Sequence, residues 1–462
     1  MRELLVIDKS VALTRVAKIS DNKLKTLFVD NHFEQSRQDK IYIGQVIDIV
    51  KSLQAAFVDI GTDKKAMLHF KHIPENERNN LKIGTRIAVQ VTKEQMGDKG
   101  DRLSAFINIT GSYAVCLVNE TGIAVSKKIN DNRDYFKELV QTISQNKFGF
   151  IIRTNAQYVS EEVLIKELNY LIQKATELEN TKQVLAKGSI FKTEQITYGK
   201  WLLQQKLESN ELDILCNDEV ELNNICNFIQ TFMSHIKTTN KLYPVNEALF
   251  ITVGIEKIFK ECLKPKVWLK NGGNIVIEHT EAMTIIDVNS AKAVVKKDVF
   301  PLNKFAIEEA LLQCIKRNIC GIIIIDLVET ENSNDKVVLY EYAKELIEQH
   351  DPKRMKVYKI TDIGLLQLTR TRVNRPLHEC LLESVYQLGL KQTKYQMAHI
   401  IFQIEEKLRQ ISQPSIKITF AQQFYGFVTK NNIVNKLEET YKININVEYS
   451  NDLTTLYFKL SS

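Results

Sequence analysis

Residues 284–290 of this 462-residue chain read T-I-I-D-V-N-S, and residues 321–327 read G-I-I-I-I-D-L. Each stretch is rich in isoleucine, as strands are, and each run of apolar residues ends in an aspartate, Asp287 or Asp326. Packing does not explain such a carboxylate, because an unpaired charge withdrawn from water costs several kcal/mol or shifts its pKa. We therefore expect two buried strands that present an oxygen-rich pocket to a divalent cation, which favours metal-assisted phosphate chemistry.

The segments around these two strands predict an α/β layer. Residues 268–279 form a hairpin pattern with its turn at 271–274, and helices are expected over about 303–317 and 334–349, the second stopped by Pro352. Alternating strands and helices place the two aspartate strands side by side. Ligands of such sheets bind beyond the carboxyl ends of the strands, where both aspartates fall.

Asn289 adds a third polar group to this pocket. Residues two apart on a strand share a face, so Asp287 and Asn289 point the same way. Mg²⁺ keeps several waters and is held by one or two carboxylates plus phosphate, a set that Asp287 and Asp326 complete. For either aspartate alone, capping of a neighbouring helix is an equally good interpretation. The pair together with Asn289 favours the cation.

The first half of the chain has a different texture. Apolar segments at 4–7, 11–18 and 24–30 predict three strands. From Ile41, several short strands with glycine turns predict a small closed barrel of the oligonucleotide-binding type, with the polar stretch 93–101 as a hairpin tip. A strand after Gly149, an amphipathic helix from Ser160, a helical connection through Trp201 and a strand at 212–217 follow. Residues 395–462 form a small α+β unit.

Basic and aromatic residues offer candidate contacts to nucleic acid. Barrel aromatics can stack on unpaired bases while lysines follow the backbone, although most barrel aromatics are core; the candidates are Phe57, Phe70, Phe106, Tyr42 and Tyr113, with Lys51, Lys64, Lys65 and Lys71. Arg153 and Thr154 end a strand and suit a terminal phosphate, but a solvent-exposed arginine is the commoner case. Arg370, Arg372 and Arg375 form a phosphate strip or a solvated basic face.

Composition bounds the class of protein. Hydrophobic residues make up 44% and charged residues 26%, with a net charge of +6, which describes an ordinary globular protein compatible with a polyanion partner. No apolar run is long enough for a membrane span, and the acidic residues Glu3 and Asp8 argue against a secretory signal. Seven dispersed cysteines indicate free thiols and a cytoplasmic location. The histidines show no metal-binding spacing.

These motifs together resemble the ribonuclease E/G family of bacterial endoribonucleases. The resemblance runs from residue 1 to about 376 and is carried by Y-I-G-Q-V, S-L-Q-A-A-F-V-D-I-G, I-I-R-T, G-G-N-I-V-I-E-H-T-E-A-M-T-I-I-D-V-N-S, G-I-I-I-I-D-L and I-G-L-L-Q-L-T-R-T-R. The string H-T-E-A-x-T-x-I-D-V-N-S is highly specific for that family. These 462 residues do not include the long disordered scaffold of ribonuclease E, so we expect ribonuclease G to be the closer likeness within the family.

The resemblance implies an α/β multidomain architecture, in which an RNase H-like subdomain is interrupted by an oligonucleotide-binding (OB-type) barrel and a 5′-end sensor. A DNase I-like catalytic subdomain and a small α+β C-terminal domain follow. The boundaries are 1–35 and 200–262 for the RNase H-like subdomain, 36–113 for the barrel, 114–199 for the sensor region, 263–376 for the DNase I-like subdomain, 377–394 for a link and 395–462 for the C-terminal domain.

The resemblance also assigns residues to roles. Asp287, Asn289 and Asp326 match the catalytic positions, with the two aspartates binding Mg²⁺ or alternatively Mn²⁺. Arg153, Thr154 and Arg354 match the sensor of the 5′-monophosphate. Contacts to RNA are expected from Phe57, Met67, Lys65, Arg370 and Arg372, where Met67 replaces a second aromatic residue.

The chain also departs from the family pattern. The usual C-P-x-C segment, through which paired subunits share zinc, is replaced by N-R-P-L-H-E-C-L with the single Cys380. We therefore expect no zinc, and a homodimer rather than a zinc-linked tetramer if the chain assembles. The approach to the sensor is also altered, reading T-G-I-A-V-S-K-K.

The sequence thus predicts a magnesium-dependent endoribonuclease that cleaves single-stranded RNA, such as ribosomal RNA precursors or messengers, and leaves 5′-phosphate products. With two evident carboxylates, one metal is favoured over two. A non-catalytic RNA-binding protein of the same family is the alternative. A DNA nuclease is a third, which the single-strand character of the barrel disfavours.

Overall fold

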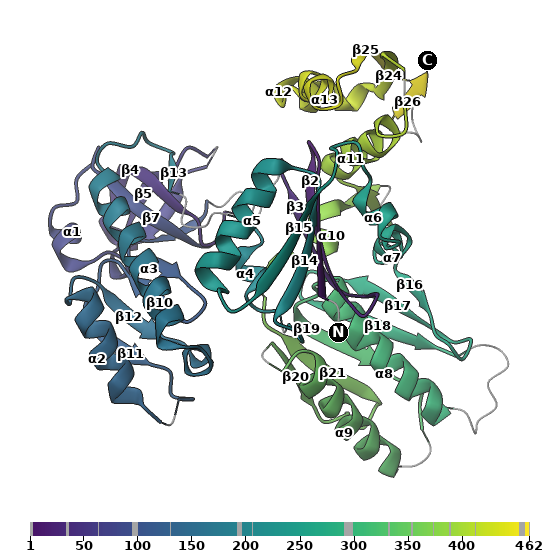
Figure 1. Cartoon of the computed structure of the whole chain (residues 1–462), viewed down its shortest axis with the longest axis horizontal. Coiled ribbons are helices and arrows are strands. Elements are labelled where there is room, and N and C mark those ends of the chain that lie inside the picture. Colours follow the sequence, from purple (N-terminus) through teal and green to yellow (C-terminus); the bar gives the residue numbers. More distant parts are fainter. Residues whose placement is uncertain are drawn as a thin grey trace. The chain divides into compact units, whose positions relative to one another are not determined.

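The computed structural model of the chain describes residues 3–33, 37–62, 64–94, 100–129, 131–191, 196–205, 207–290, 299–330, 333–352, 354–372, 374–387, 390–411, 413–451 and 458–461. The chain folds as two compact units (Figure 1). The larger unit comprises Met1–Gln35, Lys206–Leu222 and Lys237–Ser462, and the smaller unit comprises Ser36–Gln205 and Asn223–Ile236. In sequence, the smaller unit is therefore an insertion into the larger one.

The larger unit begins with a five-stranded sheet of order β15-β14-β1-β2-β3. The three predicted N-terminal strands are confirmed as the antiparallel strands β1 (Glu3–Lys9), β2 (Leu13–Ser20) and β3 (Lys23–Asn31). The predicted strand at 212–217 is β14 (Glu211–Cys216), which pairs in parallel with β1 and with β15 (Lys237–Leu242). The short helices α6 (Leu249–Thr252) and α7 (Glu256–Glu261) follow.

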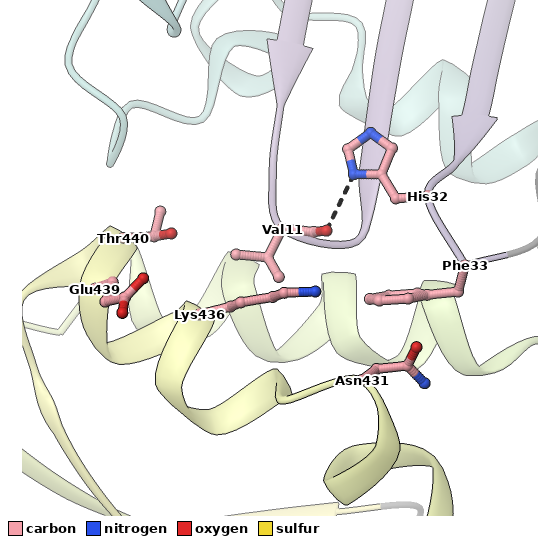
Figure 2. A pocket seen from close by; sticks show the side chains of 7 residues that line it. All are labelled: Val11, His32, Phe33, Asn431, Lys436, Glu439 and Thr440. Carbon is pink, nitrogen blue, oxygen red and sulfur yellow. Dashed lines mark hydrogen bonds between the residues drawn. The ribbon is translucent and has the colours of Figure 1, made fainter. Parts of the chain in front are cut away.

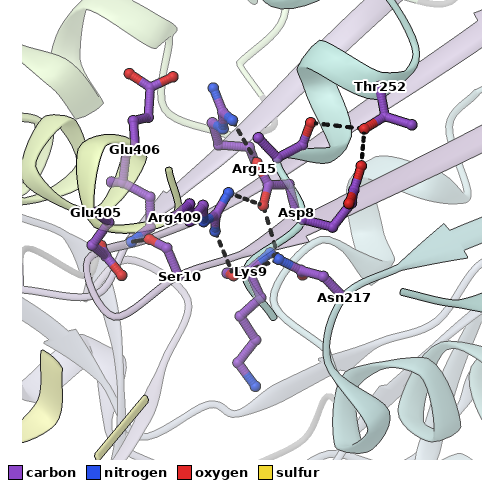
Figure 3. A network of polar contacts seen from close by, with 12 residues as sticks. Asp8, Lys9, Ser10, Arg15, Asn217, Thr252, Glu405, Glu406 and Arg409 are labelled. Atoms are coloured by element: carbon purple, nitrogen blue, oxygen red, sulfur yellow. Dashed lines mark hydrogen bonds and ion pairs between the residues drawn. The ribbon is translucent and has the colours of Figure 1, made fainter. Parts of the chain in front are cut away.

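A charged network is buried beside this sheet (Figure 3). The Asp8 carboxylate, fully buried on β1, accepts hydrogen bonds from the guanidinium groups of Arg15 and Arg409, the latter at 2.9 Å, and from the Asn217 amide at 3.0 Å. Arg15 also donates to Glu256 at 2.9 Å. Arg409 follows helix α11 (Met397–Leu408), so the network ties the C-terminal part of the chain to the first sheet.

The second sheet of the larger unit has six strands in the order β16-β17-β18-β19-β21-β20. Their bounds are Lys266–Trp268, Asn274–His279, Met283–Asn289, Gly321–Asp326, Leu365–Arg370 and Met355–Tyr358, in that order. The described strands pair antiparallel except β18 and β19, which pair in parallel; that these two strands are neighbours is what the sequence predicted. This pairing brings the two aspartate strands side by side.

Helices α8 (Val299–Lys316) and α9 (Ser333–His350) cover one face of this sheet (Figure 1). Both match the predicted helices, with α8 starting four residues earlier than expected. Buried alternate residues of the strands, such as Ile286, Ile323 and Leu366, pack against apolar residues of both helices. The other face of the sheet carries the remaining alternate residues, and many of these are exposed.

The predicted barrel is confirmed in the smaller unit. Strands β4 (Ile41–Val50), β5 (Ala55–Asp59), β6 (Ala66–His69), β8 (Arg102–Ser104) and β7 (Arg86–Lys93) pair in this order, and β7 returns to β4 to close the barrel. Strand β13 (Ile190–Phe191) adds to β4, and the short helix α1 (Glu75–Asn79) lies between β6 and β7 in sequence. Residues 95–99 of the predicted hairpin tip lie outside the described residues.

A four-stranded sheet, β11-β12-β10-β9, completes the smaller unit. Its strands are Ile123–Val125, Gly149–Ile152, Ala114–Leu117 and Asn108–Thr110, in that order. The predicted strand after Gly149 is thus β12, and the predicted amphipathic helix from Ser160 is α3 (Glu161–Thr181), which packs in one core with α2 (Arg133–Ser144). The expected helical connection at Trp201 is the single turn α4 (Gly199–Leu202), and α5 (Glu219–Phe232) follows β14.

The last part of the chain is the predicted small α+β unit. Helix α10 (Leu377–Leu381) and the hairpin β22–β23 (Leu382–Gln387 and Leu390–Tyr395) lead into α11. The three-stranded sheet β25-β24-β26 follows, built from Asn444–Ser450, Ser415–Ala421 and Phe458–Ser461, with α12 (Tyr425–Lys430) and α13 (Ile433–Tyr441). Among the helices that the structure describes, none is long and apolar enough to cross a membrane.

Candidate functional site

Asp287 and Asp326 form an in-register pair on the open face of the six-stranded sheet. They are direct partners across the parallel strands β18 and β19, so both side chains leave the sheet on the same side. Because neighbouring strands lie about 4.8 Å apart, the two carboxylates are neighbours in one row. Both residues are exposed, so solvent and a large substrate have access to them.

The exposure of Asp287 and Asp326 corrects the prediction that their strands are buried. The isoleucine run before each aspartate predicted a buried strand, whereas helices α8 and α9 cover only one face of the sheet. The buried side chains are the alternate ones, such as Ile286, Val288 and Ile325, and the aspartates belong to the other set. The carboxylates therefore keep their hydration, and their grouping rather than their desolvation marks the site.

Asn289 completes the cluster, as its spacing from Asp287 predicted. Its Nδ2 donates to Asp287 Oδ2 at 2.7 Å, which fixes one carboxylate oxygen and, among the residues that the structure describes, leaves the other available. The turn that precedes β17 packs close to the Asn289 backbone. A side-chain carbon at Gly273 would lie 3.0 Å from the Asn289 carbonyl oxygen and 2.6 Å from a terminal methyl of Leu302, so a larger residue fits only if its neighbours shift.

The donor set suits a hard divalent cation. Two carboxylates with open oxygens, next to each other and next to water, match the way in which proteins hold Mg²⁺ through few ligands and several waters. Within the described part of the chain, no group of three or more His, Cys, Asp or Glu side chains is arranged to enclose a metal ion. The pair therefore fits a cation that shares its coordination with water and substrate, rather than a closed structural site.

A second candidate surface lies on the outside of the barrel. Phe57 on β5 and Met67 on β6 are direct partners, and Met67 is in turn opposite Arg102 on β8. Phe57 and Met67 are half-buried and Arg102 is exposed, whereas the alternate residues of these strands fill the barrel core. Lys65, also exposed, directly precedes β6. An apolar platform with flanking cations suits unpaired bases and their phosphates.

Three of the other barrel aromatics have structural positions, while Phe106 is half-buried. Tyr42 and Tyr113 are buried, and the Tyr113 hydroxyl donates to the Phe232 carbonyl at 3.2 Å. Phe70 packs partly against the barrel core. Sequence analysis missed Arg102, because only the register of β6 and β8 places it beside Met67.

Comparisons with known proteins agree with these surfaces. A model described as the ribonuclease E/G family matches residues 108–373, more than half of the chain, and a model described as the S1 RNA binding domain matches residues 36–106. The chain belongs to the ribonuclease E/G family. The S1 match covers the strands of the closed barrel, and the family match covers both aspartates.

Individual relatives support the same assignment. The chain is 29% identical to ribonuclease G of Haemophilus influenzae over 402 residues, which cover 80% of this chain and 79% of the relative. It is 31% identical to a ribonuclease E/G-like protein of Porphyra purpurea, over 77% of this chain and 72% of that one. Ribonuclease G of Escherichia coli is 27% identical, with 82% and 81% covered.

The residues that resemble the sensor of the ribonuclease E/G family lie in the smaller unit, at the end of β12. Arg153 donates to the Gly111 carbonyl at 2.8 Å, and the Thr154 hydroxyl lies 2.9 Å from that of Ser126. Exposed lysines follow Ser126 in the altered S-K-K stretch, at positions 127 and 128. Sequence analysis missed Ser126 as a partner of Thr154, although it had noted that stretch.

A buried carboxylate shapes the loop that supports Arg153. The Glu167 carboxylate on α3 accepts hydrogen bonds of 2.7–2.8 Å from the backbone N–H groups of Ser112, Tyr113 and Ala114. Burial raises the pKa of Glu167, while these three bonds oppose the shift. A side chain at Gly111 would meet the Glu167 carboxylate at 2.4 Å, which explains the glycine at this position.

Arg354, the third expected sensor residue, belongs to the larger unit. Its guanidinium donates to Asn318 Oδ1 at 3.0 Å and to the Thr371 carbonyl, and burial lowers its pKa to about 10. Its part in sensing stays a prediction.

The expected arginine strip is engaged in contacts within the larger unit. Arg370 is buried, donates to Asp351 at 2.7 Å and also binds Asn318 and the Ile319 carbonyl. We therefore do not carry Arg370 into a contact with RNA. Arg372 is exposed and forms a two-pronged pair with Glu379 at 2.7 and 3.2 Å.

The link region contains the cysteine that stands near the missing zinc segment. Cys380 is buried in the core of the larger unit, its Sγ lies 3.5 Å from the Val29 carbonyl oxygen, and burial raises its pKa to about 12. The thiol therefore packs within its own chain. His378, two residues earlier, stacks on His279 of β17 with ring centroids 3.4 Å apart.

A cavity of about 340 Å³ lies elsewhere in the larger unit, between the first sheet and helix α13 (Figure 2). It is lined by Val11, His32, Phe33, Asn431, Lys436, Glu439 and Thr440. The His32 ring is held by the Val11 carbonyl and by the Thr14 hydroxyl, so it has a structural role. None of the predicted site residues lines this cavity.

Proposed function

We propose that this chain is a magnesium-dependent endoribonuclease that hydrolyses phosphodiester bonds in single-stranded RNA. One observation carries the proposal: Asp287 and Asp326 lie in register on parallel strands, on an open face, with Asn289 bonded to Asp287. Membership of the ribonuclease E/G family and the S1 match support ribonuclease activity and RNA as the partner.

In this proposal, Asp287 and Asp326 hold Mg²⁺ or Mn²⁺, and two carboxylates favour a single ion. A cation bound there would lower the pKa of its water and stabilise negative charge on the phosphoryl oxygens. Asn289 keeps one oxygen of Asp287 in place, so that the carboxylate pair is oriented before substrate binds. The open sheet face admits a polynucleotide, and the products carry a 5′-phosphate and a 3′-hydroxyl.

RNA would be bound by the barrel surface. Phe57 and Met67 form the platform for unpaired bases, and Lys65 and Arg102 supply charge for the backbone. Arg372 would contribute a further contact when its guanidinium leaves the exposed ion pair with Glu379 and binds an RNA phosphate. Unpaired regions of ribosomal RNA precursors or messengers are the substrates.

Terminal-phosphate sensing would use Arg153 and Thr154 of the smaller unit, and a role for Arg354 rests on the resemblance alone. The charge-assisted hydrogen bonds of a guanidinium and a hydroxyl suit a 5′-monophosphate. The RNase H-like and DNase I-like assignments of the two sheets in the larger unit belong to the same proposal, as do a cytoplasmic location and a homodimer without zinc.

The decisive experiment compares the wild-type chain with Asp287→Asn on a short, AU-rich RNA that carries a 5′-monophosphate. Loss of the cation ligand removes several kcal/mol of transition-state stabilisation, so we expect cleavage to fall about 10³-fold. RNA affinity, measured in EDTA, and thermal stability should stay close to wild type, because Asp287 is exposed.

Asp134→Asn is the matched control, since Asp134 is an exposed carboxylate on α2 that pairs with Lys137. It should cleave like the wild type. A wild-type chain that binds RNA but cuts it with neither Mg²⁺ nor Mn²⁺ would be a non-catalytic RNA-binding member of the family. A DNA oligonucleotide of the same sequence tests the DNA nuclease alternative, which requires equal or faster cleavage of DNA.

A further inference from the structure

The chain has two tryptophans in contrasting environments. Trp201 is 1% exposed, whereas Trp268, on the edge strand β16, is 67% exposed. The Nζ of Lys266, two residues earlier on the same face of β16, lies 4.2 Å from the centroid of the Trp268 ring. A large exposed aromatic side chain with an adjacent cation is a feature that packing does not require.

The strand register places this pair on the face that carries the aspartates. Lys266 is opposite Val276, which is opposite Asp287, so Lys266 and the carboxylates occupy one row of the sheet. The next row joins Trp268 through Asn274 to Asn289. Two strand spacings separate β16 from β18, which is about 10 Å.

The arrangement matches the requirements of a polynucleotide that crosses the aspartate pair. An unpaired base presents a flat surface that stacks on an indole, while the flanking phosphates need a cation. A duplex hides its bases in its own stack, so an aromatic platform at this place favours single strands. Asp287 and Asp326 lie in the same row as Lys266. Their negative charges would repel the RNA backbone unless a bound cation or the lysine offsets them.

We propose that Trp268 stacks on an unpaired base next to the scissile phosphate and that Lys266 binds a phosphate beside it. This subsite rests on the proposed function, because it takes the same RNA that Asp287 and Asp326 would cleave. Stacking is tolerant of sequence, and its strength grows with the area of the base, so a purine is favoured at this position.

Tryptophan fluorescence measures occupancy directly, because iodide quenches the exposed Trp268 and spares the buried Trp201. The measurement is made in EDTA with a short single-stranded RNA, so that binding is observed without cleavage. We expect saturating RNA to shield the iodide-sensitive fraction of the emission. In Trp268→Phe that fraction should already be absent, which assigns the signal.

Affinity supplies the second measurement. Trp268→Ala should raise the Kd for single-stranded RNA about tenfold, while Trp268→Phe keeps most of the affinity because it keeps a ring. Tyr425→Ala, which removes an exposed aromatic ring of α12, is the matched control and should bind like the wild type. With Mg²⁺, Trp268→Ala should also lose the preference for a purine beside the cleavage site.

The subsite is overturned if RNA leaves iodide quenching unchanged, or if Trp268→Ala binds RNA as tightly as the wild type. Shielding of Trp268 that rises with protein concentration in the absence of RNA would instead identify the face as an interface with a second copy. If the fluorescence and affinity results hold but no RNA is cut with Mg²⁺ or Mn²⁺, the subsite stands and the proposed function fails. If RNA is cut and Trp268→Ala changes neither binding nor cleavage, the proposed function stands and the subsite fails.

Discussion

Asp8 and Asp287 lie in similar sequences and opposite environments. Both follow an aliphatic run in a strand of the larger unit, L-L-V-I-D on β1 and T-I-I-D on β18. Asp8 is fully buried and bonded to Arg15, Arg409 and Asn217, whereas Asp287 is exposed and bonded to the Asn289 amide. The same local pattern thus gives a structural carboxylate in one sheet and a candidate ligand in the other.

The difference lies in how the two charges are compensated. The buried carboxylate has arginines as permanent partners, and the rings of Phe250, Phe259 and Phe402 surround the Arg15 guanidinium at 4.1–4.8 Å. The carboxylate of Asp287 is exposed to solvent and keeps one oxygen available for a ligand. Removing the first charge should therefore affect stability, and removing the second should affect activity.

Asp8→Asn tests the structural side of this comparison and should have the largest effect on stability. It leaves Arg15 and Arg409 buried with less negative charge, which costs about 3–5 kcal/mol when one partner of a buried pair is lost. We expect a lower midpoint for unfolding of the larger unit, followed by circular dichroism or calorimetry.

Asp287→Asn is the matching test at the exposed carboxylate. We expect it to leave the midpoint of unfolding unchanged and to abolish cleavage. Equal midpoints for Asp8→Asn and the wild type would contradict the structural role of the network. A large loss of stability in Asp287→Asn would show that the exposed carboxylate also supports the fold.

His399, on α11 close to the same network, predicts how acid affects the larger unit. Burial, and then the charge of Arg15, lowers the pKa of His399 to about 4. The unfolded chain binds a proton near pH 6.5 and the folded chain only near pH 4, so stability falls as the pH drops through this window. The loss approaches about 3 kcal/mol at pH 4.

The measurement is the midpoint of thermal unfolding between pH 7 and pH 4. His399→Leu, which cannot take up the proton, should show a shallower decline than the wild type. His235→Gln is the control, since His235 is exposed and should leave the decline unchanged. Parallel curves for His399→Leu and the wild type would show that His399 does not carry this pH dependence.

The sequence predicted those features that depend on local periodicity. Two-residue spacing placed Asp287 and Asn289 on one face, and alternating strands and helices brought β18 and β19 together; both are confirmed. Short strands with glycine turns also predicted the barrel, whose closure between β4 and β7 is confirmed.

Features that depend on distant partners were not predictable. Arg409 is 401 positions from Asp8, so no local pattern reveals that Asp8 is paired. Arg370 resembled part of a basic strip, but Asp351, 19 positions earlier in the chain, neutralises it in the interior. The run of four isoleucines before Asp326 shows no alternation, which concealed the open face of β19.

Asn289→Ala should have the smallest effect of these substitutions. It removes the side-chain amide that is bonded to Asp287. Loss of a hydrogen bond to a charged group amounts to about 1.5 kcal/mol, which corresponds to roughly a tenfold fall in cleavage rate. Stability should change little, because Asn289 is partly exposed on the open face and its side-chain hydrogen bond goes to the exposed Asp287. The cation dependence separates the two roles that this amide could have. If Asn289 acts by orienting Asp287, the Mg²⁺ concentration for half-maximal cleavage should rise in Asn289→Ala, and in Asp287→Asn the added Asn289→Ala change should have no further effect. If the amide instead contacts the phosphate, the Mg²⁺ requirement stays as in the wild type and only the rate at saturating Mg²⁺ falls. An unchanged rate at every Mg²⁺ concentration would remove Asn289 from the site.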